Sequence, residues 1–180
     1  MSEVVLRIAS WDDVPRSTDA GAVLIVLDGS VPGKPAAGLS RLAALDAPIV
    51  ASLAGHGSAA ALALALAASC AFASESFSVD CSDPRDVLEL GLGGRLVATV
   101  GVGQAKTILF GPQPVAAGRL AASGALTVSA DPEAAAAEAA SRLAADPDAR
   151  LLVRSLHAAG RSTSAQAAAY DSELLQLLGE

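Results

Sequence analysis

Short apolar runs alternate with polar segments along the N-terminal part of the chain. Val4–Ile8, Ala22–Leu27 and Pro48–Leu53 are rich in β-branched residues and predict three strands, of which the second is buried on both faces. Asp28–Gly38 predicts a loop because it is dense in Gly and Pro, and the leucines of Leu39–Ala47 have helical spacing. Strands that alternate with a loop and a helix are typical of parallel strands joined by crossovers, so we expect an α/β core.

The stretch Ala47–Ser74 contains no formally charged side chain, which makes a membrane-spanning helix an alternative to a buried core. Pro48 stands near its start and Gly55–Ser58 interrupts it, so a strand, a glycine turn and a helix are favoured over one spanning helix. The high Ala and Leu content after Ser58 predicts a helix that is buried nearly all round, followed by a short strand at Cys70–Ala73.

The second half of the chain predicts helices. Asp-Pro pairs at 131–132 and 146–147 begin two of them, because the aspartate can cap the helix and the proline suits its first position. Other helices are expected over 103–111, 114–123 and 164–178. One domain is therefore predicted, with an α/β core over residues 1–128 and a helical region over 129–180 whose apolar faces favour oligomerisation.

Composition narrows the classes of function. The 180 residues carry a formal net charge of -7, which argues against a nucleic-acid partner, and no basic membrane-surface helix is visible. Cys70 and Cys81 lack metal-ligand spacing, so neither a zinc site nor a disulfide framework is indicated and no metal is expected. Aromatic residues are scarce, and Trp11 is expected to pack at the surface. The N-terminal segment fits no secretory signal, so we expect a cytoplasmic chain that begins near Met1.

Five segments follow one another in a recognisable order. They are Gly55-His56, Ala59–Ala61, Phe72–Ser76, Leu90–Gly94 and Gly103–Val128. In this order and spacing the chain resembles the crotonase superfamily, the enoyl-CoA hydratase and isomerase proteins, in which a triple glycine stands in place of Ala59–Ala61. The resemblance runs from about Ala22 to the C-terminus, and the part before it is too short for the family's extra N-terminal strands and first helix.

The resemblance implies a fold and an assembly. The expected fold is α/β, a ClpP/crotonase-like spiral of ββα units with a parallel sheet and C-terminal helices, truncated at the N-terminus. The family also implies a homo-oligomer, either a trimer or a hexamer, or a hetero-oligomer with a crotonase-type enzyme.

The resemblance also implies an oxyanion hole, in which two backbone N–H groups hold a thioester oxygen while negative charge develops on it. By position the donors are Ala37 and Ala60. The two carboxylates of the family's hydratases fall on Ala63, which can do no proton chemistry, and on Asp83, which can act as a general base. The acyl-CoA cleft is expected at six further residues, Gly38, Gly55, His56, Gly91, Gly93 and Gly94.

Other interpretations of these residues stay open. Asp83 precedes a proline, as ordinary turn and cap residues do. Ser58 beside His56 suggests a hydrolytic nucleophile, but adjacent residues rarely reach the required geometry, and a turn histidine is favoured. Lys34 and Arg41 flank the oxyanion loop, where a contact with the phosphates of coenzyme A competes with the favoured interpretation of solvated surface charges.

Two functions follow from the resemblance. The first is a lyase or isomerase of acyl-CoA and fatty acid metabolism that stabilises a thioester enolate with at most one catalytic carboxylate, so one-base isomerisation is favoured over two-carboxylate hydration. The second is a catalytically inactive accessory or scaffold subunit that partners a larger acyl-CoA or polyketide enzyme. No cofactor is expected, because coenzyme A enters as part of the substrate.

Overall fold

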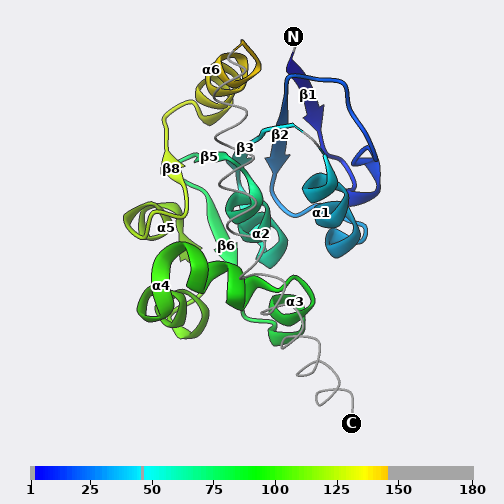
Figure 1. Ribbon diagram of the computed structural model, residues 1–180. Coiled ribbons are helices and arrows are strands. Elements are labelled where there is room, and N and C mark those ends of the chain that lie inside the picture. Colours follow the sequence, from blue (N-terminus) through cyan, green and yellow to red (C-terminus); the bar gives the residue numbers. More distant parts are fainter. Residues whose placement is uncertain (1–2, 46, 146–180) are drawn as a thin grey trace.

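The computed structural model describes residues 3–45 and 47–145, and its centre is a parallel sheet (Figure 1). This sheet has the strand order β1 (Glu3–Arg7), β2 (Ala22–Asp28), β3 (Ile49–Ala54), β5 (Cys70–Ala73) and β8 (Thr127–Val128). A second sheet contains the short strands β4 (His56–Ser58), β6 (Ser78–Asp80) and β7 (Val115–Ala116). Strands β4 and β6 are parallel, and β7 is antiparallel to β6.

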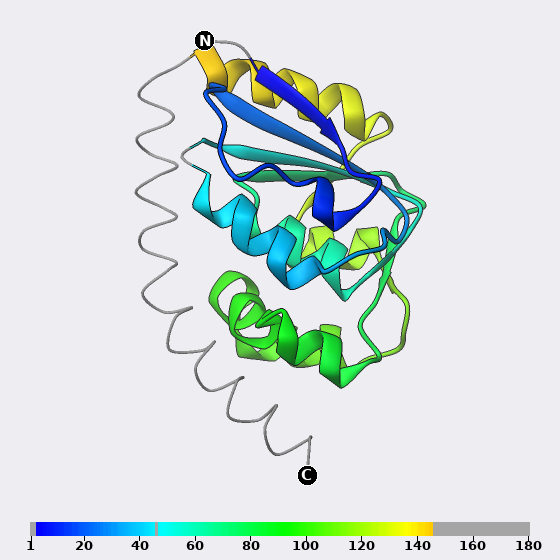
Figure 2. The ribbon, with the colours of Figure 1, turned by 90° about the vertical axis from the view of Figure 1, so that its right-hand side faces the viewer.

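Helices cover both faces of the main sheet (Figure 2). One face carries α6 (Pro132–Ala145). The other faces η1 (Trp11–Asp13), α1 (Pro35–Ala44), α2 (Ala59–Ala67), α3 (Pro84–Glu89), α4 (Leu92–Phe110) and α5 (Ala117–Ala122). The order β3-β4-α2 is followed by β5-β6-α3, so the chain repeats a ββα unit as predicted.

The central strands bury side chains on both faces, because successive residues of a strand point to opposite sides of the sheet. In β2, Val23 and Ile25 belong to the main core beneath the sheet, whereas Ala22 and Leu24 pack in a second cluster with the alanines of α6. This confirms the prediction that the run 22–27 is buried on both sides.

Helix α2 accounts for the long uncharged stretch. Every residue from Ala59 to Ala65 is at most 4% exposed, so a charged side chain at any of these positions would be buried away from water. Gly57, just before the helix, is equally confined, since a Cβ there would lie 2.7 Å from the Cβ of Ala61. Within residues 3–45 and 47–145, no helix has the length and hydropathy needed to cross a membrane.

Several predicted boundaries differ from the observed ones. Helix α1 begins at Pro35, inside the predicted loop, because proline at the first helical position starts the helix early. Helix α4 extends well before the predicted start at 103 and is kinked at Gly101, which has a φ of 77°. Strands β4, β6, β7 and β8 were not predicted, since runs of two or three residues carry no periodicity.

The Asp-Pro start of α6 is confirmed. Asp131 Oδ1 accepts a hydrogen bond from the N–H of Ala134 at 2.9 Å, and Pro132 is the first residue of the helix. The second Asp-Pro start at 146–147 and the helix expected over 164–178 lie outside the described residues.

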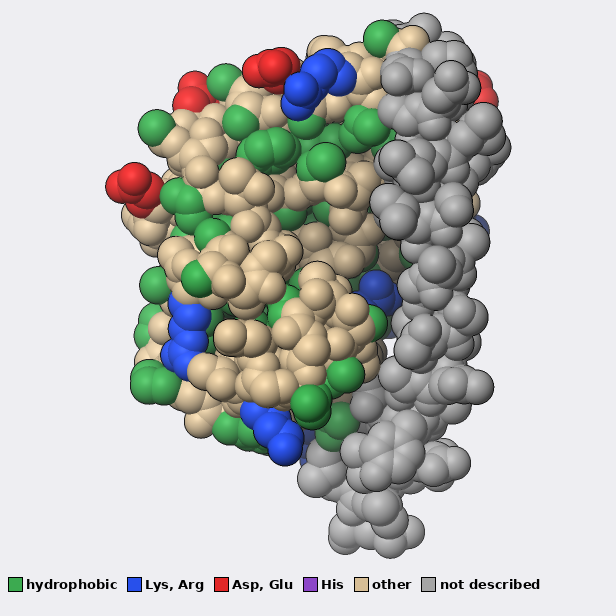
Figure 3. All heavy atoms as spheres, turned by 60° about the vertical axis from the view of Figure 1, so that its left-hand side comes forward, with side chains coloured by type: hydrophobic (Ala, Val, Ile, Leu, Met, Phe, Trp, Pro, Cys, Tyr) green, Lys and Arg blue, Asp and Glu red, His purple; other side chains and the backbone are tan. Residues whose placement is uncertain are grey.

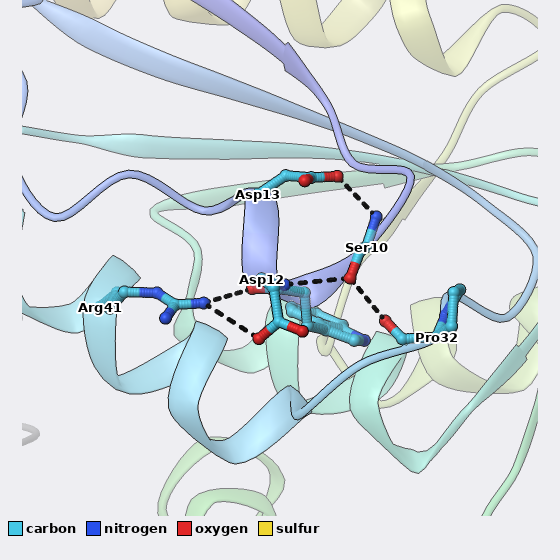
Figure 4. Close-up of polar contacts among 6 residues, drawn as sticks. Ser10, Asp12, Asp13, Pro32 and Arg41 are labelled. Carbon is cyan, nitrogen blue, oxygen red and sulfur yellow. Dashed lines mark hydrogen bonds and ion pairs between the residues drawn. The ribbon is translucent and has the colours of Figure 1, made fainter.

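Trp11 is 1% exposed, so the prediction that it packs at the surface is wrong. It lies against α1, where a Cβ on Gly38 would be 2.8 Å from Trp11 Cε3. Ser10 and Asp13 cap the short helix η1 reciprocally (Figure 4), which folds the polar neighbours of Trp11 into a turn. The indole itself packs in the main core.

Candidate functional site

The carboxyl ends of β2 and β3 meet at one edge of the sheet. Asp28 and Ala54 lie opposite each other in the register, and the N–H of Gly29 donates to the carbonyl of Ala54 at 2.9 Å. The loops that follow are also in contact, since Ser30 Oγ donates to the carbonyl of His56 at 3.4 Å. The segments that lead into α1 and α2 are therefore neighbours, at the edge where open α/β sheets bind ligands.

Gly55 makes this close approach feasible. Its φ is 69°, in the left-handed region, and a Cβ would lie 2.9 Å from Asp28 Oδ1 and 3.2 Å from Gly29 N. The turn from β3 into β4 thus needs glycine both for its backbone conformation and for the space beside Asp28.

The two predicted oxyanion donors both lie in the first turn of a helix. Ala37 is the third residue of α1 and Ala60 the second residue of α2, positions whose N–H groups have no partner within the helix. Neither Lys34 nor Ser58 caps its helix with a side chain, and within the described residues no acceptor is recorded for either N–H group. Both groups are thus free to donate to a ligand oxygen.

Alanine at position 60 fits this geometry. A residue with a side chain would be strained there if φ were positive, yet within the described residues only glycines have positive φ. Ala60 is 4% exposed and Ala37 is exposed, so the two donors differ in their access to water.

Asp83 is the N-cap of α3. Its Oδ1 accepts a hydrogen bond from the N–H of Arg85 at 2.8 Å, and the residue is exposed. The cap uses Oδ1, and no described residue engages Oδ2. Ala63, the other carboxylate position of the family, is fully buried in the main core.

A polar face of the second sheet gathers four side chains. Positions 56 and 58 of β4 lie opposite 78 and 80 of β6, while Gly57 and Val79 between them are buried. His56 Nδ1 and Ser78 Oγ are 2.8 Å apart, so the hydrogen bond of His56 is with Ser78 and not with Ser58, two residues along the same strand. The sequence analysis missed Ser78, although the spacing of polar residues in His-Gly-Ser and Ser-Val-Asp could have paired the two segments.

Asp80 completes this face. Hydrogen bonds from Ser82 hold the pKa of the Asp80 carboxyl below its ordinary value, and His56 nearby acts in the same direction. Asp80 is thus a carboxylate beside a histidine that is itself hydrogen-bonded to a serine.

The glycines assigned to the acyl-CoA cleft fall into different surroundings. Gly91 is the N-cap of α4, with a φ of 58° in the left-handed region, and Gly93, in the first turn, has open space where a Cβ would stand. Gly94 is half-buried beside Arg95, whose pKa is lowered by burial. Gly38 instead accommodates Trp11, so its lack of a side chain serves packing.

Arg41 is held by the N-terminal turn. Its Nη2 donates to the carbonyl of Trp11 at 2.6 Å and lies 3.9 Å from Asp12 Oδ1 (Figure 4). The side chain is only 23% exposed, so the preferred interpretation as a solvated surface charge is wrong for Arg41. Lys34 is exposed, as expected for a surface charge.

The cysteines do not form a reactive pair. Cys70 and Cys81 are both free, and burial raises the pKa of the Cys81 thiol to about 12. Among the residues that the structure describes, no group of three or more His, Cys, Asp or Glu side chains is arranged to hold a metal ion.

Exposed apolar side chains occur on α4. Val97, Val102 and Phe110 are 46%, 59% and 82% exposed. Hydrophobic side chains also reach the surface in the lower part of Figure 3, over α4 and α5. Such exposure fits the predicted oligomer, which stays a prediction.

Solved structures share this fold. An enoyl-CoA hydratase/isomerase from Pseudoalteromonas atlantica T6c has a TM-score of 0.75 at 15% identity, covering 94% of this chain and 85% of its own. An enoyl-CoA hydratase from Mycobacterium avium subsp. paratuberculosis has a TM-score of 0.73 at 24% identity, covering 88% and 72%. ThnE from S. clavuligerus has a TM-score of 0.73 at 16% identity, covering 96% and 95%. No family model and no curated protein sequence matches the chain.

At these identities the similarity is one of fold. The enoyl-CoA hydratase/isomerase structures align with most of the chain, which confirms the predicted crotonase-like α/β fold. The resemblance drawn from Gly55-His56 and the segments after it is thereby confirmed at the level of architecture.

Proposed function

We propose that this chain, which has the crotonase fold, binds an acyl-CoA thioester and holds the thioester oxygen on the N–H groups of Ala37 and Ala60. The observation that carries the proposal is the pair of uncapped first turns in α1 and α2, at the sheet edge where their leading loops are in contact. In α3 and α6, by contrast, Asp83 and Asp131 each accept a hydrogen bond from one N–H group of the first turn. Helices α4 and α5 also lack a side-chain cap, so it is the contact between the loops leading into α1 and α2 that distinguishes this pair.

Two such donors stabilise an enolate. Removing a proton from the α-carbon of a thioester places negative charge on its oxygen, and donors that already point at that oxygen lower the barrier. The positive ends of the α1 and α2 dipoles act in the same direction. In a serine protease, loss of one oxyanion donor reduces turnover by about 100- to 1000-fold, which sets the scale expected here.

Asp83 is the group we propose as the base. Capping of α3 engages Oδ1 and orients the carboxylate, which leaves Oδ2 to accept the α-proton. A single carboxylate suits proton abstraction and return, as in double-bond isomerisation, and does not suit hydration by two carboxylates, because Ala63 carries none.

The alternative is a non-catalytic subunit that binds an acyl-CoA for a larger enzyme of acyl-CoA or polyketide chemistry. One observation favours it: the only carboxylate at the two family positions already has a structural task as a helix cap. The alanine at the buried position 63 also fits a site that binds the thioester but has lost a catalytic carboxylate.

Two measurements test the proposal. Thermal unfolding is followed with acetyl-CoA, crotonyl-CoA and free coenzyme A, and we expect the two thioesters to stabilise the chain more than free coenzyme A, which lacks the thioester carbonyl. Equal midpoints with and without the thioesters would overturn the binding proposal.

Exchange of the α-protons of acetyl-CoA in D2O then separates enzyme from accessory subunit. We expect exchange in the wild type and at least about a 100-fold loss in Asp83→Asn, which keeps a good cap but cannot take the proton. Asp86→Asn, in the same exposed turn of α3, is the control and should exchange normally. Thioester binding without exchange supports the accessory function.

A further inference from the structure

Strand β1 is an edge strand of the main sheet in the described part of the chain. It pairs with β2 on one side, and no described strand or helix lies beyond it (Figure 2). Val4 and Val5 are 38% and 49% exposed there. An edge of five residues with exposed valines is a template for pairing with another strand.

The direction of the free backbone groups follows from the pairing with β2. The N–H of Ile8, directly after β1, donates to the carbonyl of Val26. Because backbone groups of successive strand residues point to alternate sides, the even-numbered residues face β2 and the odd-numbered residues face outward. Glu3, Val5 and Arg7 therefore present their N–H and C=O groups at the open edge.

These three residues are self-complementary in one register. In an antiparallel pair of two copies centred on Val5, Val5 lies opposite its own counterpart, and Glu3 of each copy lies opposite Arg7 of the other. All three oppositions are of the kind in which two residues exchange both backbone hydrogen bonds. The same register puts an acidic position of the sequence opposite a basic one at both ends, an arrangement that favours cross-strand pairing.

We infer that β1 pairs antiparallel with β1 of a second copy of this chain, joining the two main sheets into one across a two-fold axis. An isologous contact requires a surface that is complementary to itself. The run Glu-Val-Val-Leu-Arg meets this requirement, because its charged positions and its outward backbone groups both match those of an antiparallel copy. The contact is independent of the proposed thioester site, which lies at the carboxyl edge of the sheet.

Arg7 is suitably placed for this contact. It already pairs with Glu133 of α6, which holds its side chain on the α6 face of the sheet. In the joined sheet both α6 helices lie on the same face, so each Arg7 lies between Glu133 of its own chain and position 3 of the other.

The test compares masses by sedimentation velocity. Glu3→Arg sets arginine against Arg7 of the other copy, and Arg7→Glu sets glutamate against Glu3, so we expect each variant alone to have half the mass of the wild-type assembly. Mixed one to one, the two variants are complementary at both ends, and the wild-type mass should return. Arg16→Glu, which changes the charge at an exposed position by the same amount as Arg7→Glu does, is the control and should assemble as the wild type does.

A backbone variant tests the hydrogen bonds separately. Val5→Pro removes an N–H group that faces outward, so it should halve the mass while the midpoint of urea unfolding at low protein concentration changes little. An unchanged mass in all three variants, a monomeric wild type at 100 µM or so, or failure of the mixture to recover the wild-type mass would each overturn the inference.

Discussion

The guanidinium of Arg41 in α1 donates to the backbone carbonyl of Trp11 at 2.6 Å, and this contact joins the N-terminal turn to the helix that carries one proposed oxyanion donor. The indole of the same Trp11 fills the space left by Gly38. The position of α1 against the rest of the fold therefore depends on residues that precede β2 in the sequence.

Replacing Arg41 should loosen this junction. Arg41→Ala leaves the carbonyl of a buried residue without its donor, and we expect a loss of about 1–3 kcal/mol in the free energy of unfolding, measured with urea. Arg16→Ala, at an exposed position, should stay within about 0.5 kcal/mol of the wild type. Equal stability of the two variants would show that the contact contributes nothing.

Replacing Gly55 tests the turn from β3 into β4, and Gly124 is a matched control for it. Both have positive φ, but a Cβ meets Asp28 and Gly29 at Gly55 and nothing at Gly124. Alanine should cost about 1–2 kcal/mol of stability at either position through backbone strain. Gly55→Ala should lose about 1–3 kcal/mol more through overpacking, and equal losses would contradict the close approach of the two loops.

The cap on α3 makes Asp83 a structural residue whether or not it is a base. Asp83→Ala should lower the free energy of unfolding by about 1 kcal/mol, because the N–H of Arg85 loses its acceptor. Asp83→Asn should unfold at nearly the wild-type urea concentration. A similar loss in both variants would mean that charge, rather than the cap hydrogen bond, stabilises α3.

Cys81 should make the fold sensitive to alkali. Burial raises the pKa of its thiol from 9.0 to about 12, so above pH 9 the unfolded chain releases a proton that the folded chain retains. Stability contributed by the protonated thiol is complete below pH 9 and falls as the pH rises toward 12. In urea unfolding between pH 8 and 11, Cys81→Ala should show a shallower decline than the wild type, and identical slopes would contradict this.

Local patterns predicted the elements whose causes are local. The two-sided burial of β2 follows from a run of apolar residues, and the start of α6 follows from Asp131 and Pro132 alone. Each depends on residues within one turn or one strand, so the sequence contains the whole of the physical reason.

The positions of His56, Trp11 and Arg41 depend on contacts between segments that are distant in the sequence. His56 meets Ser78 because β4 pairs with β6, two strands of three residues whose existence depends on each other. Trp11 is buried because Gly38 of α1 leaves space for its indole. Arg41 is partly buried because its guanidinium donates a hydrogen bond to the carbonyl of Trp11. The burial of Trp11 and the contact of Arg41 leave no local pattern in the sequence, and the alternating polar residues of β4 and β6 are too few to identify each other as partners.

The sequence by itself determined the α/β class and the burial of the uncharged stretch as a strand, a turn and a helix, because composition and spacing are sufficient for each. The resemblance to the crotonase superfamily added that Ala63 stands at a position where the hydratases have a carboxylate. The tertiary structure decided that Asp83 caps α3, that α1 and α2 begin at the same sheet edge, and that, among the described residues, no side chain caps their first turns and no second strand pairs with the outer side of β1. These are relations between backbone groups far apart in the chain, and such groups acquire neighbours only when the strands take their order in the sheet.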